Sequence, residues 1–168
     1  MQLIYGNAFT TDCDALCITT NGFVKNNGQA VMGKGIAKSI QRYFPNIQQD
    51  LGELIRTKGN NVHIIYQTEP NIISFPVKPI SGISDGTNHV SHLNFKKGER
   101  VPGWAMKAGL EIIETSAYQL VELADNNPWN TIVLPRPGCG AGELTWEQVE
   151  PVLANILDDR FKVITYAR

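Results

Sequence analysis

The sequence predicts a layered α/β domain whose central sheet is largely parallel or mixed. Short apolar segments typical of buried strands alternate with segments of helical periodicity along the 168 residues. Two of these strands are followed by glycine-rich loops. The first loop covers residues 21–37, with its glycine motif at 28–37, and the second covers residues 137–144. The chain shows no repeats, low-complexity runs or linkers, so we expect one domain that spans residues 1–168.

Six segments have the composition of short strands. They are rich in β-branched and aromatic residues, and turn-forming residues bound most of them. The segment 14–20 (DALCITT) has the character of a buried strand and leads into the first of the two loops. The expected strands are residues 2–5, 14–20, 62–66, 72–75, 131–134 and 161–166.

Four segments carry apolar residues at helical spacing, at residues 36–44, 46–58, 105–124 and 145–157. Asn46 with Gln49, and Thr145 with Gln148, have the spacing of a capping box. Pro151 lies deep in the last segment, which predicts a kink or a later helix start there. Residues 76–102 carry turn formers without periodicity, and a loop of that length is usually functional or mobile.

Composition and charge exclude several classes of protein. Fifteen basic residues against 16 acidic ones give a net charge of −1, which is no footprint for general nucleic-acid binding. The short basic segment from Lys96 to Arg100 leaves a nucleic-acid partner open. Three cysteines argue against a disulfide framework and for a reducing compartment. We expect a cytoplasmic monomer with no membrane partner, no metal and no cofactor, because neither a signal peptide nor a ligand constellation is visible.

The glycine motif of the first loop (residues 28–37) comes close to two known nucleotide motifs and matches neither. Gly28 and Gly33-Lys34 have P-loop spacing, but Gly35 stands where the Mg²⁺-binding Ser or Thr would be. A dinucleotide-binding fingerprint fails as well, because Lys38 stands where a glycine is required. What remains is a strand, a glycine-rich turn and a helix start, which together favour an anion near free backbone N–H groups.

The second glycine loop (residues 137–144, PGCGAGEL) also follows a buried strand. In a parallel sheet the two loops open at the same carboxyl edge, where ligands bind. Two adjacent groups of backbone N–H donors suit a diphosphate better than a single phosphate.

These segments carry a resemblance to a known family. They are Asn21, Gly28, residues 32–37 (MGKGIA), residues 75–78 (FPVK) and residues 134–146 (LPRPGCGAGELTW). The chain resembles a macro domain over nearly its whole length. It is most similar to the branch that contains ADP-ribose-1''-phosphate phosphatases and DNA-ADP-ribose glycohydrolases, with single-domain phage members of similar length. The resemblance implies a three-layer α/β/α fold with a mixed central sheet that binds ADP-ribose or ADP-ribose-1''-phosphate.

The resemblance also implies the ligand-binding residues. Gly6-Asn7 matches the start of the adenine-contacting turn, where the family usually has Asp, and Asn21 matches an asparagine near the distal ribose. The expected ligand-binding residues are Asn7, Ala8, Asn21, Asn27, Gly28, Met32, Gly33, Lys34, Gly35, Ile36, Ala37, Pro137, Gly138, Cys139, Gly140, Ala141, Gly142, Glu143 and Leu144.

The family's hydrolase residues are not all present. Ala37 and Gln41 stand where related hydrolases carry an Asp and a Lys, and Gly142 stands where one type carries a second Asp. Phosphatase action on ADP-ribose-1''-phosphate demands less, because it needs a held phosphate, a water and a group to activate that water. We therefore expect the protein to hydrolyse ADP-ribose-1''-phosphate to ADP-ribose and phosphate. The candidate catalytic residues are Asp85, His89 and Glu143, and His92 in the same irregular segment could also activate the water. The alternatives are a non-catalytic ADP-ribose reader, or a hydrolase that removes ADP-ribose from protein or nucleic acid through Lys38 and Glu143.

Overall fold

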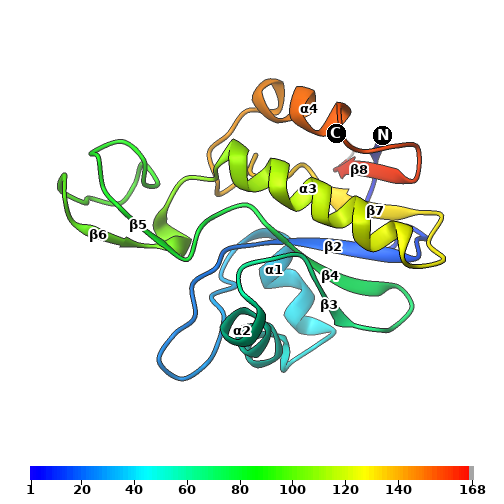
Figure 1. Cartoon of the computed structure of the whole chain (residues 1–168), viewed down its shortest axis with the longest axis horizontal. Coiled ribbons are helices and arrows are strands. Elements are labelled where there is room, and N and C mark those ends of the chain that lie inside the picture. The colour runs from blue at the N-terminus through cyan, green and yellow to red at the C-terminus, as the bar shows by residue number, and fades with distance from the viewer. Residues whose placement is uncertain (167–168) are drawn as a thin grey trace.

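A six-stranded sheet lies between two layers of helices (Figure 1). The computed structural model describes residues 1–166. The main sheet consists of β1 (Gln2–Tyr5), β2 (Ala15–Thr20), β3 (His63–Tyr66), β4 (Asn71–Pro76), β7 (Ile132–Pro135) and β8 (Phe161–Thr165). The helices are α1 (Gly35–Ser39), α2 (Ile47–Lys58), α3 (Leu110–Asp125) and α4 (Trp146–Ala154), with short 3₁₀ turns η1 (Ile40–Arg42) and η2 (Gly103–Ala105). The predicted α/β class with a mixed central sheet is confirmed.

The order of strands is β1-β8-β7-β2-β4-β3, and each neighbouring pair is parallel except β3 with β4. β2 and β7 are therefore adjacent parallel strands, with Ala15 opposite Ile132 and Leu16 opposite Val133. In Figure 1 the chain leaves both strands on the side of the sheet that faces the β5–β6 hairpin. The two glycine loops thus begin at the same edge.

Two hydrophobic cores show why the sheet has helices on both faces. Alternate residues of a strand point to opposite faces, so β2 contributes Ala15 and Cys17 to one core and Leu16 and Ile18 to the other. The first core contains the buried faces of α3 and α4, and the second contains those of α1 and α2. This division produces the three layers.

Tertiary hydrogen bonds shorten the third predicted helix at its start. Periodicity predicted a helix from residue 105, but α3 begins at Leu110. The N–H of Ala108 donates to Gly142 O (3.0 Å) and that of Gly109 to Val77 O (3.0 Å), which holds this segment extended. Periodicity could not predict these two hydrogen bonds, because their acceptors, Gly142 O and Val77 O, are far away in the sequence.

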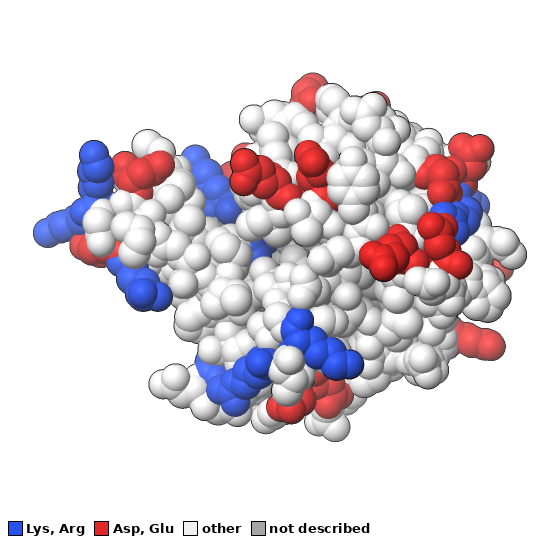
Figure 2. Space-filling model, viewed as in Figure 1, with Lys and Arg blue, Asp and Glu red and all other residues white. Residues whose placement is uncertain are grey.

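The long segment that precedes α3 is more ordered than its sequence predicted. β5 (Ser81–Ile83) and β6 (Arg100–Pro102) pair as an antiparallel hairpin, and a small core of its own lies beside them. Residues 81–108, which contain this hairpin, the residues between its strands and η2, form a lobe beside the main sheet. Figure 2 shows Lys and Arg side chains on the outer surface of this lobe. The residues of this basic surface are Lys96, Lys97 and Arg100.

The two capping boxes that the sequence predicted have different outcomes. Thr145 and Gln148 form a complete capping box, and α4 begins directly after Thr145, with Pro151 inside the helix. The predicted later start is therefore wrong, because the box fixes the helix start. Asn46 is the N-cap residue of α2, but its side chain makes no capping hydrogen bond, so the predicted box with Gln49 is absent.

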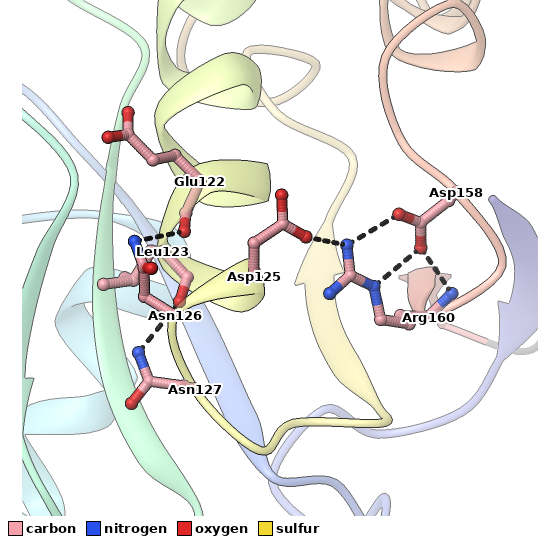
Figure 3. A network of polar contacts seen from close by, with 7 residues as sticks. All are labelled: Glu122, Leu123, Asp125, Asn126, Asn127, Asp158 and Arg160. Atoms are coloured by element: carbon pink, nitrogen blue, oxygen red, sulfur yellow. Dashed lines mark hydrogen bonds and ion pairs between the residues drawn. The ribbon is translucent and has the colours of Figure 1, made fainter.

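Side-chain amides and an arginine hold the end of α3 (Figure 3). The Asn126 and Asn127 amides donate to Glu122 O (3.0 Å) and Leu123 O (2.8 Å), which satisfies carbonyls that the helix leaves free. Arg160 pairs with Asp125 (2.8 Å) and Asp158 (2.7 Å). Within residues 1–166, none of the helices has the length and apolar character needed to span a bilayer.

The packing of α2 generates the first prediction. A Cβ on Gly52 would lie 1.9 Å from the carbonyl oxygen of Gly28. An exposed Gly→Ala change in a helix normally stabilises a protein by about 0.5–1 kcal/mol. We expect Gly52→Ala to lower the free energy of unfolding by about 1–3 kcal/mol instead, because the backbones cannot separate without disturbing the loop. Urea denaturation checks this.

The matched control is Glu53→Ala, at the adjacent exposed position of α2. It should change the free energy of unfolding by less than about 0.5 kcal/mol. A Gly52→Ala protein as stable as the original would show that α2 and the first glycine loop are not in close contact.

Candidate functional site

Both glycine loops line one cleft of about 1300 Å³ at the carboxyl edge of the sheet. The first loop contributes residues 32–37, and the second contributes Gly138 to Gly142 together with Leu144. The ends of β2, β7 and β8 lie at the bottom of the cleft through Thr20, Pro135 and Thr165. The lobe that contains β5 and β6 adds a further wall through Val90, His92 and Trp104.

The glycines of the two loops serve different purposes. A Cβ on Gly142 would lie 2.6 Å from Ala108 Cβ, and Gly138 is similarly crowded, so both allow close packing behind the cleft. A Cβ on Gly33, Gly35 or Gly140 would have no neighbour within 4 Å. All three line the cleft, but the φ of Gly35 is +61°, a conformation that favours glycine whatever the space around it. For Gly33 and Gly140, neither a positive φ nor a neighbouring protein atom requires a small residue. A ligand that touches the backbone does require it.

Backbone N–H groups in both loops lack acceptors among the described residues. The first N–H groups of α1 have no acceptor within the helix, as at the start of any helix. Lys34, which precedes α1, does not cap them with its side chain. In the second loop the N–H groups of residues 140–142 donate to no carbonyl, whereas those of Glu143 and Leu144 donate to Gly140 and Gly138. Two groups of free donors therefore face a single cleft, which favours an anion with more than one phosphate.

The charges of the cleft favour the same kind of ligand. Lys34, Lys38, Lys78 and Arg136 are among its lining residues, whereas Glu147 is the one acidic lining residue in the described chain. The Arg136 guanidinium lies over the Trp146 ring, 4.9 Å from its centre, which fixes its position at the rim. A net positive cleft attracts phosphate groups.

Lys78 is the most unusual charged group of the site. It is only 7% exposed and lies two residues after the end of β4. Its Nζ donates to the Trp104 carbonyl oxygen (3.0 Å). Burial, with repulsion from Lys34, lowers the pKa of the amine from 10.5 to about 8, although the Glu143 carboxylate acts against this. About a tenth of the amine is therefore uncharged at pH 7, far more than for an ordinary lysine, and an uncharged amine can act as a base or nucleophile.

Most of the ligand-binding residues expected from the sequence line the cleft. They are Ala8, Asn21, Met32, Gly33, Lys34, Gly35, Ile36, Ala37, Gly138, Cys139, Gly140, Ala141, Gly142 and Leu144. The Asn21 side chain also orders the first loop, because its amide donates to Val31 O (3.0 Å) and its oxygen accepts from the Phe23 N–H (2.9 Å).

Five expected ligand residues lie outside this lining: Asn7, Asn27, Gly28, Pro137 and Glu143. The Asn7 side chain accepts from the Phe9 N–H (2.9 Å), and Asn27 and Gly28 belong to a turn that packs against α2. Pro137 is buried behind the second loop. Glu143 points to the lobe, where it binds Ser91.

The three candidate catalytic residues, Asp85, His89 and Glu143, do not line the cleft. Asp85 is exposed and accepts from the N–H groups of Thr87 (2.7 Å) and Asn88 (2.9 Å), which is a local turn contact. His89 is buried in the lobe, where its ring packs against Phe95. These two residues hold the lobe together, and no geometry places them beside a ligand.

His92, which the sequence offered as a candidate to activate water, does line the cleft. Sequence reasoning did not name four other lining residues as ligand-binding or catalytic, namely Phe9, Lys78, Trp104 and Arg136. A signal for Lys78 existed, because a lysine at the carboxyl end of a continuous apolar strand lies at the edge where the two loops open. No such signal existed for Trp104, which reaches the cleft only through the fold of the lobe. Among the described residues, no cluster of three or more His, Cys, Asp or Glu could hold a metal ion.

The surroundings of Lys78 lead to a prediction about its pKa. Lys34→Ala removes a repelling charge and should raise the pKa of Lys78 above about 8, whereas Glu143→Gln removes an attracting charge and should lower it. Side-chain NMR titration of labelled lysines would measure both. Lys97→Ala, on the lobe surface, is the control and should leave this pKa unchanged. Equal Lys78 pKa values in all three variants would contradict the proposed environment.

We compared the chain with protein families, with known sequences and with solved structures. No protein-family model matches the chain. It is 23% identical over 159 residues to a DNA ADP-ribosyl transferase–DNA ADP-ribosyl glycohydrolase fusion protein of Thermosipho africanus, and it spans 39% of the length of that relative.

Among solved structures, the chain is similar to the macrodomain of Mycobacterium tuberculosis DarG (TM-score 0.71, 22% identical, 99% of both chains covered). It is also similar to the macrodomain of Thermus aquaticus DarG (TM-score 0.69, 22% identical, 99% of this chain and 97% of that one). A third is Thermosipho africanus DarTG in complex with ADP-ribose (TM-score 0.70, 17% identical, 96% of this chain and 40% of that one). The chain therefore has the macrodomain fold.

Proposed function

We propose that the cleft binds ADP-ribose and that the protein hydrolyses the bond between its terminal ribose and a modified macromolecule. The observation that carries the binding proposal is the meeting of two glycine loops, from adjacent strands, in one basic cleft. Their free N–H donors suit a diphosphate, and the half-buried Phe9 offers an apolar surface for a base. A related fold has been solved in complex with ADP-ribose.

The buried amine of Lys78 supports hydrolysis. Its lowered pKa makes part of the amine neutral near neutral pH, so that it can take a proton from a water molecule. The oxygen of that water bonds to the carbon at which the ribose is linked, while the bond from this carbon to the macromolecule breaks and the macromolecule leaves with a proton. Modified DNA is the first substrate to test, because the fusion protein to which the chain is similar is named a DNA ADP-ribosyl glycohydrolase.

A second candidate is phosphatase action on ADP-ribose-1''-phosphate. The observation that favours it is His92, which lines the cleft and can activate water. Incubation of the protein with ADP-ribosylated DNA, ADP-ribosylated protein and ADP-ribose-1''-phosphate separates the alternatives. Free ADP-ribose from a macromolecule supports the first proposal, and phosphate release supports the second. Binding of ADP-ribose without turnover of any substrate would identify a reader.

The glycines that face open space lead to a prediction about affinity. Gly33 and Gly140 line the cleft, and a Cβ at either position would have no protein atom within 4 Å, so we choose Gly33→Val and Gly140→Val. Each should weaken ADP-ribose binding by about tenfold or more, because a blocked N–H group loses a charge-assisted hydrogen bond. Calorimetry measures this, with Asn94→Val on the lobe surface as a control that retains affinity. Full affinity in either glycine variant would remove that loop from the site.

The assignment of Lys78 leads to a separate prediction about rate. Lys78→Met keeps the apolar stem and removes the amine, so kcat should fall by about 100-fold or more. The ADP-ribose Kd should change by less than about tenfold, because the loop N–H groups remain. In the original protein kcat/KM should rise as the pH increases through about 8, as the amine loses its proton. Normal kcat in Lys78→Met would exclude this role, with Lys97→Ala as the charge control.

A further inference from the structure

A short segment of the lobe, here called the strap (residues 90–92), is tied to the second glycine loop by a single side chain. Val90 and His92 line the cleft, whereas Ser91, between them, contacts Glu143. The Ser91 N–H donates to one carboxylate oxygen of Glu143 (2.8 Å), and the Ser91 hydroxyl donates to the other. These bonds join parts of the chain that are 52 residues apart.

The backbone of Glu143 indicates that this tie has a role. Its φ of +63° is the one left-handed value of a non-glycine residue in the described chain. A side chain in this conformation costs about 1–2 kcal/mol, and glycine would adopt it without that cost. Such strain persists where a side chain supplies something that glycine cannot. Here the side chain supplies the two hydrogen bonds to Ser91.

Backbone hydrogen bonds hold the strap within the lobe and hold the second glycine loop beside α3. On the lobe, the Val90 N–H donates to Ala105 O (2.8 Å) and the Leu93 N–H donates to Val90 O (3.1 Å). On the loop, Gly142 O accepts from the Ala108 N–H (3.0 Å). The Glu143 carboxylate is therefore the contact that connects the middle of the strap to the loop whose N–H groups face the cleft.

The carboxylate is suited to a charged contact. Hydrogen bonds from Ser91 hold the pKa of Glu143 below its usual range, and Lys107 and His92 act in the same direction. Glu143 therefore accepts both bonds as an anion, and hydrogen bonds to ionised acceptors are stronger than those between neutral groups.

We propose that Glu143 is a positioning residue that ties the strap to the second glycine loop and so holds Val90 and His92 in the cleft wall. The tie orders both walls before the ligand arrives, so binding pays less to order them and the ligand leaves more slowly. The inference rests on the proposed function in one respect, which is that ADP-ribose is the ligand used to measure it.

The test compares Glu143→Gly, Ser91→Ala and the double variant. Each single change should raise the Kd for ADP-ribose about five- to twentyfold, mainly through faster dissociation measured by the fluorescence of Trp104 and Trp146. Glu143→Gly removes both hydrogen bonds, whereas Ser91→Ala removes only the one from the hydroxyl. The double variant should therefore bind no more weakly than Glu143→Gly alone. Glu99→Gln, an exposed carboxylate on the lobe, is the control and should bind like the original protein.

Thermal unfolding distinguishes positioning from a merely structural role. Glu143→Gly should change the Tm little, because the relief of backbone strain offsets the loss of two exposed hydrogen bonds, while its affinity still falls. Unchanged affinity in Glu143→Gly, or multiplying effects of the two changes in the double variant, would overturn the proposal.

Hydrogen exchange in the ligand-free protein keeps this inference separate from the proposed function. The Ser91 amide should exchange at least about tenfold faster in Glu143→Gly than in the original protein, because its acceptor is gone. Equal exchange rates would overturn the tie. If the original protein fails to bind ADP-ribose, the proposed function fails, and the exchange experiment still decides whether the tie exists.

Discussion

Parallel pairing between β2 and β7 brings together two segments that are far apart in the sequence. Both strands are buried on the two faces of the sheet, because α1 and α2 cover one side and α3 and α4 cover the other. Their register cannot change without moving apolar side chains out of both cores. The ends of the strands, and so the starts of the two glycine loops, are fixed by the same packing that stabilises the protein. A cleft built in this way is rigid at its base.

The walls of the cleft depend on weaker contacts. The lobe that contains β5 and β6 has only a small core of its own, and it meets the second loop through the Ala108–Gly142 bond and the Glu143 carboxylate. Lys78 lies between the lobe and the two loops, with its amine on the Trp104 carbonyl oxygen. Burying an amine with so few partners raises the free energy of its charged form. The same burial that opposes the charge makes the neutral amine accessible for chemistry.

Several features could be predicted from the sequence because their causes are local. The periodicity of α2, the capping box of α4 and the apolar character of β2 depend on nearby residues, and all three elements occur close to the expected positions. The start of α3 and the β5–β6 hairpin depend on distant carbonyl groups, and there the predictions from periodicity are wrong or incomplete. The same distinction applies to the site. Glycine loops that follow strands can be recognised in the sequence. Asp85 and His89 are candidate catalytic residues by residue type, but in the structure their side chains make local contacts within the lobe.

The sequence by itself determined the class of fold and the positions of the two glycine loops, because alternating apolar patterns and glycine-rich turns act over a few residues. Only the tertiary structure decided which side chains share the cleft with those loops. Lys78 and His92 reach it through β4 and the lobe, and Glu143 turns away from it to Ser91. The physical reason is that burial and charge at a site come from segments that meet only in the folded chain. Lys78 is one example, because burial and the nearby charge of Lys34 together lower its pKa.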